Sequence, residues 1–126
     1  MNKQALKHIL EHALQTLEES FTYDRGRDYC LCGQIRAAYH ELYRGVKLFE
    51  ESDNLPFHID RSQPFIITKY LRYKYSIDKP LNTFWWPIAV NPWEVNEPWA
   101  VKGRQSRLAF LNQAISDLES EIKEGL

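Results

Sequence analysis

The sequence has little that is typical of a secreted or strongly charged protein. Its 126 residues include only two cysteines and five glycines, and 16 basic residues are balanced by 17 acidic ones. Two cysteines cannot build a disulfide framework, and a near-neutral chain has no global field that attracts nucleic acid or membranes. Sites in which backbone amides bind anions need glycines and are therefore scarce. Nucleic-acid binding would require a local patch.

Long apolar runs are also missing. The longest is Phe84–Val90, which is far too short to span a bilayer. Charged residues interrupt the N-terminal MNKQALKHILEHAL, unlike the apolar core of a signal peptide. We therefore expect a cytoplasmic protein with reduced thiols and no membrane partner. A hydrophobic content of 44% at this length predicts one globular domain over residues 1–126.

The sequence lacks the common motifs of enzymes. It has no phosphate-binding glycine loop, no G-x-S-x-G elbow and no H-E-x-x-H pair. Asp24, Asp28 and Asp60 could share a cleft with His40 or His58, but no spacing requires this. We therefore expect neither catalysis nor a cofactor.

His8, His12, Cys30 and Cys32 form a candidate set of zinc ligands. Structural zinc sites normally space their cysteines by two to four residues, whereas one intervening residue splays the two thiols. The two histidines share a helix face opposite the apolar stripe. We therefore predict no metal site, but two solvated histidines and two partly buried thiols.

Helical periodicity dominates both ends of the chain. Residues 2–21 carry apolar residues at spacings of three and four, after a possible cap at Asn2. Residues 34–51 carry a second stripe, which Gly45 weakens. Residues 104–123 carry a heptad-like stripe made of Leu108, Leu111, Ile115, Leu118 and Ile122. Each range predicts an amphipathic helix.

The middle of the chain is less regular. Residues 65–77 fit a helical period and also nearly alternate as in a strand, and Ser62 with Pro64 favours a helix. Four prolines exclude regular helix through most of 78–103. The predicted fold class is mainly α, an antiparallel assembly of three or four helices with a Trp/Pro-rich irregular segment packed across it. The alternative is α+β, with a small sheet from 65–77 and 83–90.

Charges on the first and last helices oppose their helix dipoles. Basic residues come early in each helix and acidic residues come late. The early residues are Lys3, Lys7, Arg104 and Arg107, and the late residues are Glu18, Glu19, Asp117, Glu119, Glu121 and Glu124. We therefore predict that the two helices pack antiparallel, with Lys3 and Lys7 beside Glu121 and Glu124 and with Glu18 and Glu19 beside Arg104 and Arg107. The same pattern suits a homodimer through the C-terminal helix, ranked second to a monomer.

Tryptophan is concentrated in one segment, FWWPIAVNPWEVNEPWAV (84–101). All four tryptophans lie there, among prolines that restrict the chain. Tryptophan is enriched at binding hot spots, and a restricted chain loses less entropy on binding. We predict a protein-binding surface formed by Trp85, Trp86, Trp93 and Trp99, with Trp93 or Trp99 partly exposed.

A second candidate surface interleaves basic and aromatic residues between positions 61 and 79. Basic side chains neutralise phosphates while aromatic rings stack on bases. The candidates are Lys69, Arg72, Tyr73, Lys74 and Tyr75. The alternative interpretation is an amphipathic element whose tyrosines pack and whose charges are solvated.

Three functional hypotheses follow. The first is a non-catalytic protein-binding accessory protein, of the kind with which phages and mobile elements inhibit host machinery, including defence proteins. The second is nucleic-acid binding through 61–79. The third is a small enzyme or a metal-binding protein. The first rests on protein type rather than on a motif.

Overall fold

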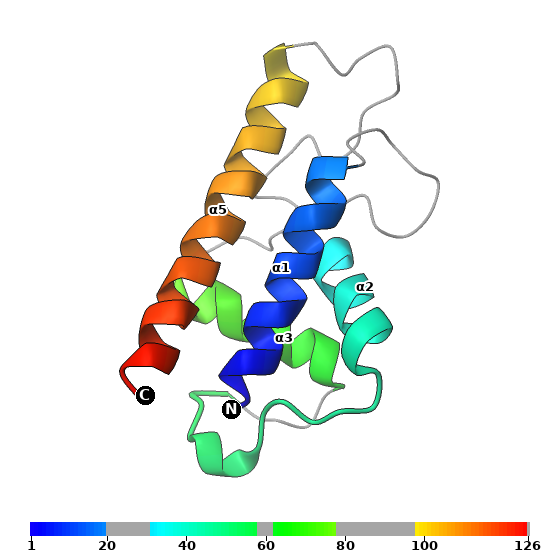
Figure 1. Cartoon of the computed structure of the whole chain (residues 1–126). Helices are drawn as coiled ribbons and strands as arrows, with labels where there is room; N and C mark the ends of the chain where they lie inside the picture. The colour runs from blue at the N-terminus through cyan, green and yellow to red at the C-terminus, as the bar shows by residue number, and fades with distance from the viewer. Residues whose placement is uncertain (20–30, 58–61, 78–97, 126) are drawn as a thin grey trace.

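Helices make up most of the chain that the structure describes. The computed structural model describes residues 1–19, 31–57, 62–77 and 98–125. They form helices α1 (Lys3–Glu19), α2 (Leu31–Tyr43), α3 (Gln63–Lys74) and α5 (Pro98–Lys123), with a short 3-10 helix, η1 (Glu51–Asp53). These ranges contain no strand (Figure 1). The predicted mainly helical class is confirmed, while most of the Trp/Pro-rich segment lies outside the described residues.

The first and last helices pack antiparallel, as their charges predict. In Figure 1 they lie side by side, and both chain ends are at the same end of the pair. Lys3 Nζ lies 4.0 Å from a carboxylate oxygen of Glu121, and Lys7 Nζ lies 3.6 Å from Glu119. At the other end, Arg104 donates to the backbone carbonyl of Glu18 at 3.4 Å. The orientation is confirmed, although Glu119 replaces Glu124 and a carbonyl replaces the Glu18 carboxylate.

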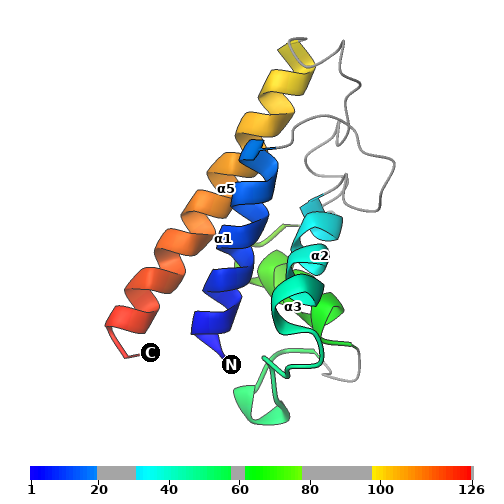
Figure 2. The same cartoon turned by 45° about the vertical axis from the view of Figure 1, so that its right-hand side comes forward.

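The core follows the predicted apolar stripes. It lies where α1 meets α5 on one side and α2 on the other, so α1 is the middle helix of the three (Figure 2). Burying one Leu or Ile side chain contributes about 1.5–3 kcal/mol, which makes this stripe the main source of stability. The buried hydrophobic residues of the two terminal helices are Ala5, Leu6, Ile9, Leu10, Ala13, Leu17, Leu111, Ala114, Ile115 and Leu118.

The predicted helix over 34–51 is wrong at its C-terminal end. α2 begins at Leu31 and ends at Tyr43. Gly45 has a φ of 81°, a left-handed value that glycine adopts at low cost, and the Val46 N–H donates to the Tyr43 carbonyl at 2.8 Å. Phe49 is fully buried without being helical. The periodic pattern assigned Phe49 to the helix, whereas the fold buries it from the segment that follows the helix.

The helix predicted over 65–77 is confirmed, and the alternative sheet is wrong for this range. α3 begins after Ser62, with Pro64 in its first turn, where the missing N–H of proline costs nothing. It ends at Lys74. The other half of the alternative sheet, 83–90, lies outside the described residues.

The last helix begins earlier than predicted. α5 starts at Pro98 rather than at residue 104, so the irregular interpretation of 78–103 is wrong for 98–103. Proline is tolerated at the first helical position because its N–H would have no partner inside the helix there. Trp99 is therefore helical, and residues 78–97 lie outside the described ranges. No helix in the described part of the chain is long and apolar enough to cross a membrane.

Candidate functional site

Three nitrogen-bearing side chains lie along one face of α2. Arg36, His40 and Arg44 are each four residues apart, which places them on the same side of the helix and its C-terminal turn. A rise of 1.5 Å per residue separates successive members by about 6 Å along the axis. The opposite face of α2 is buried in the core. This α2 row therefore points away from the core.

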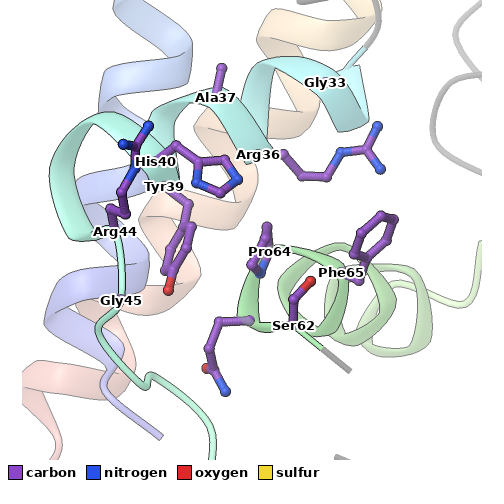
Figure 3. Close-up of a pocket in the computed structure, with 11 residues that line it drawn as sticks. Gly33, Arg36, Ala37, Tyr39, His40, Arg44, Gly45, Ser62, Pro64 and Phe65 are labelled. Carbon is purple, nitrogen blue, oxygen red and sulfur yellow. The ribbon is translucent and has the colours of Figure 1, made fainter. Parts of the chain in front are cut away.

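A cleft separates the α2 row from the start of α3. It encloses about 590 Å³ and is lined by Gly33, Arg36, Ala37, Tyr39, His40, Arg44, Gly45, Ser62, Gln63, Pro64 and Phe65. Figure 3 shows the Arg36 guanidinium above the ring of Phe65, with His40 directed toward Pro64. The Arg36 guanidinium carbon lies 5.0 Å from the ring centre, within the range of a cation–π contact. Phe65 is 53% exposed, so arginine, histidine and an apolar ring are presented together.

Hydrogen bonds between side chains and the backbone hold the walls of the cleft in place. The Gln63 side-chain oxygen accepts the backbone N–H groups of Leu48 and Phe49, at 2.8 and 3.0 Å. Its side-chain nitrogen donates to the Phe49 carbonyl at 3.4 Å. From α2, the Tyr39 hydroxyl donates to the Val46 carbonyl at 2.8 Å. These bonds tie the segment after α2 to both helices, so the cleft is built into the fold.

The carboxylate nearest in sequence to the α2 row is held on another side of the helix. Glu41, the one acidic residue of α2, pairs with His12 of α1. In α3, no residue is acidic. Among the described residues, no carboxylate forms an ion pair with Arg36 or Arg44. The face formed by α2 and α3 is therefore cationic in a chain that is nearly neutral overall.

The predicted basic-aromatic set is divided between two faces of α3. Lys69 and Tyr73 lie on the outer face in a row with Phe65, at spacings of four, and Tyr73 is 60% exposed. Phe57 packs against both: the Lys69 ammonium lies 4.8 Å from its ring centre, and the Tyr73 ring meets it edge-on at 6.4 Å. Arg72 is half-buried. Only Lys69 and Tyr73 of the five predicted residues are exposed.

Lys74 and Tyr75 instead bind acidic residues of α5. The Lys74 ammonium donates to Glu121 at 2.7 Å, and the Tyr75 hydroxyl donates to Asp117 at 2.6 Å. Burial lowers the pKa of Lys74, but the hydrogen bond to Glu121 together with the interactions with Tyr70 and the Glu121 charge outweighs burial, and the net shift is upward. Burial and then the bond to Asp117 raise the pKa of Tyr75 far above its usual range. These two side chains join the end of α3 to α5, so both form contacts within the chain.

The predicted tryptophan surface lies mostly outside the described residues. This applies to Trp85, Trp86 and Trp93. Trp99 is the second residue of α5, which corrects the expectation that it lies outside any regular helix. The partial exposure of Trp93 or Trp99 stays a prediction.

The two histidines of the candidate zinc set bind side chains of α2. His8 Nδ1 lies 2.9 Å from the Tyr43 hydroxyl, and His12 hydrogen-bonds to Glu41. They are therefore linked to α2 rather than only solvated. Cys32 is half-buried in the first turn of α2, and Cys30 lies outside the described residues. Within the described ranges, no group of three or more His, Cys, Asp or Glu side chains is placed to hold a metal ion.

Comparison with models of protein families, with curated proteins and with solved structures finds no match to the chain. The cleft is therefore interpreted from its own chemistry. Sequence reasoning missed Arg36, Arg44 and Phe65 as members of one site. The spacing of four from Arg36 to His40 and from His40 to Arg44 was a usable signal, because it places these residues beside the apolar stripe of a predicted helix. The approach of Phe65 from another helix had no local signal.

Proposed function

We propose that this chain is a non-catalytic protein-binding protein whose working surface is the α2–α3 face. We define this face by the α2 row, the cleft and the outer row of α3. The observation that carries the proposal is the Arg36 guanidinium held over a half-exposed Phe65 at the mouth of a 590 Å³ cleft. Arginine and aromatic residues are the groups most enriched at protein interfaces.

Two features of the α2–α3 face support binding to another protein. The cleft is concave and has apolar side chains, such as Pro64, next to cationic ones, a combination that seats an apolar anchor beneath polar contacts. The hydrogen bonds of Gln63 and Tyr39 hold its walls in advance, and such preorganisation reduces the entropy lost on binding. The non-catalytic part of the proposal rests on the absence of enzyme motifs from the sequence.

The class of partner follows from the type of protein. We propose that the chain acts as an accessory protein of a phage or mobile element and inhibits a host defence protein. Small size and the lack of catalytic motifs support this role, since such a chain acts by occupying another protein's surface. Plating a defence-sensitive phage on cells that carry a defence system, with and without the chain, tests it. The inhibitor role requires that the chain restore plaques.

The binding function is tested by capture with matched variants. Tagged wild-type chain, Phe65→Ala, Arg36→Ala and the control Gln105→Ala, at an exposed position of α5, are compared in lysates of cells that carry the source element or its host. We expect a protein that wild type and Gln105→Ala retain and that Phe65→Ala and Arg36→Ala lose. Truncating a hot-spot side chain costs about 2 kcal/mol or more of binding free energy, which is enough to abolish capture.

The same experiment includes the tryptophan surface. Trp93→Ala and Trp99→Ala test whether the Trp/Pro-rich segment carries the contact. If the tryptophan variants lose capture and Phe65→Ala keeps it, the working surface is the Trp/Pro-rich segment instead of the α2–α3 face. Circular dichroism of every variant separates loss of binding from loss of folding.

A further inference from the structure

We infer that the α2–α3 face binds an extended, acidic segment of a partner protein, with carboxylates at alternate positions beside an apolar side chain. The inference rests on the proposed protein-binding function and specifies the chemistry of the partner. Three observations carry it: the sign of the charge on the face, the spacing of the α2 row, and the way Phe65 supports Arg36.

The charge of the face selects an anionic partner. Arg36, Arg44 and Lys69 contribute positive charge, and His40 adds a hydrogen-bonding imidazole between the two arginines. α3 has no acidic residue, and the Glu41 carboxylate of α2 is occupied by His12. A neutral or basic segment would bring no opposite charge to these cations, whereas carboxylates complement them and steer the encounter.

The spacing of the α2 row fits an extended chain. Successive members of the row are about 6 Å apart along the helix axis. In an extended segment, residues at positions i and i+2 point to the same side and lie about 6.6 Å apart. Carboxylates at positions i, i+2 and i+4 therefore match Arg36, His40 and Arg44 in turn.

Phe65 prepares Arg36 to bind a carboxylate. A guanidinium lying over an aromatic ring keeps its N–H groups available at its edge, where they form paired hydrogen bonds with a carboxylate. The stack also limits the rotamers of the long side chain before binding, which reduces the entropy lost. Pro64 lines the cleft beside this pair (Figure 3) and offers an apolar contact to a side chain of the partner.

The same contacts favour a peptide over single-stranded nucleic acid. Nucleic-acid sites of this kind use aromatic faces as platforms for bases. Here Arg36 covers one face of Phe65, and the Lys69 ammonium lies 4.8 Å from the ring centre of Phe57. Lys74 and Tyr75, which would extend the basic track, bind Glu121 and Asp117.

Fluorescence anisotropy with defined probes tests the inference. The probe is a fluorescein-labelled nine-residue peptide with glutamate at every second position and leucine and serine between. The controls are the same peptide with glutamine in place of glutamate, and labelled oligo-dT and oligo-U. We expect the glutamate peptide to bind at least about tenfold more tightly than the glutamine peptide and each oligonucleotide.

Variants locate the probe on the α2–α3 face. Arg36→Ala and Arg44→Ala should each weaken binding of the glutamate peptide about tenfold, because each removes a charge-assisted contact. The matched control Lys102→Ala removes an exposed cation from α5 and should change affinity by less than about twofold. Equal loss, with Lys102→Ala as damaging as the arginine variants, would overturn the site.

Two further outcomes overturn the inference. Equal affinity for the glutamate and glutamine peptides would show that carboxylates are not recognised, and this arm needs only wild-type protein. Tighter binding of an oligonucleotide, lost in Arg36→Ala, would assign the face to nucleic acid. If no peptide binds while Phe65→Ala and Arg36→Ala still abolish partner capture, the acidic-segment inference fails and the proposed function stands. If capture is also unaffected, both fail.

Discussion

The α1–α5 pair and the α2–α3 face differ in whether their charged side chains form ion pairs within the chain. Across α1 and α5, lysines meet glutamates of the partner helix, as in Lys3–Glu121 and Lys7–Glu119. On the α2–α3 face, Arg36 and Arg44 lie together beside an exposed ring, and no carboxylate of the described residues pairs with them. The first arrangement is complementary within the chain, and the second is the one that we propose an acidic partner complements.

We expect the α1–α5 contact to determine the stability of the chain and the α2–α3 face to determine binding. Exposed ion pairs at the rim of α1 and α5 contribute only about 0–1 kcal/mol each, so the buried leucines and isoleucines between these helices provide the stability. Exposed cations and a ring on the α2–α3 face contribute little to folding. Substitutions in the two regions should therefore separate into those that unfold the chain and those that abolish binding.

The largest contrast is expected between Leu111→Ala and Phe65→Ala. Leu111 is fully buried in α5, so its truncation leaves a cavity and should lower the free energy of unfolding by about 2–5 kcal/mol. Phe65 is 53% exposed, and its truncation should lower that free energy by less than about 1 kcal/mol. Urea denaturation followed by circular dichroism measures both. Similar losses would erase the distinction between the two regions.

The next effect is expected at Gln63, where the α2–α3 face depends on the fold. Gln63→Ala leaves the backbone N–H groups of Leu48 and Phe49 without their acceptor. The cost should be about 1–3 kcal/mol in the free energy of unfolding, with weaker binding of the glutamate peptide. Gln105→Ala, at an exposed site of α5, is the control. If Gln63→Ala keeps both the stability and the peptide affinity of wild type, the hydrogen bonds of the Gln63 side chain do not shape the cleft.

A smaller effect is expected where α3 meets α5. Tyr75→Phe removes the hydroxyl that donates to Asp117 and should lower the free energy of unfolding by about 1 kcal/mol near neutral pH. Peptide binding should not change, because Tyr75 binds Asp117 of α5 and does not line the cleft. Urea denaturation and anisotropy on the same sample test both parts. Loss of peptide affinity in Tyr75→Phe would show that Tyr75 takes part in binding the peptide.

The same contact should weaken in alkali. Burial, followed by the bond to Asp117, raises the pKa of Tyr75 in the folded chain, and the pKa of Lys74 is also raised. Their contributions are therefore present below the unfolded values of about 10 and are lost as the pH rises toward the folded ones. Urea denaturation at about pH 8 and about pH 11 should show a smaller fall for Tyr75→Phe than for wild type. An equal fall would assign the alkaline loss to other groups.

The smallest effect is expected at the rim of α1 and α5. Lys7 lies near Glu119 and also near Glu11 of its own helix, and Glu119 is exposed. A double-mutant cycle of Lys7→Ala and Glu119→Ala should give a coupling of about 0–1 kcal/mol that decreases with added salt. Sedimentation of the same variants checks the second-ranked homodimer through α5, which would appear as a concentration-dependent mass. A coupling well above this range would make rim charges a source of stability.

Local patterns in the sequence determined the helices and the orientation of two of them. Apolar spacing identified α1 and residues 104–123 of α5, because a 3.6-residue period is a property of the chain itself. The reversed charges of both helices indicated the antiparallel pairing, since only that orientation brings opposite charges together. Ser62 and Pro64 marked the start of α3 for the same local reason.

Tertiary structure alone decided the cleft and the sorting of the basic-aromatic residues. Arg36 and Phe65 are far apart in sequence and on different helices, so no periodic pattern could place one above the other. Lys69 and Lys74 look equivalent in the sequence, yet α5 supplies Glu121 to Lys74, while Lys69 stays exposed. The sequence determined which residues are helical and charged. The packing of α3 against α2, and the bonds of its C-terminal end to α5, decided which of those charges are paired within the chain.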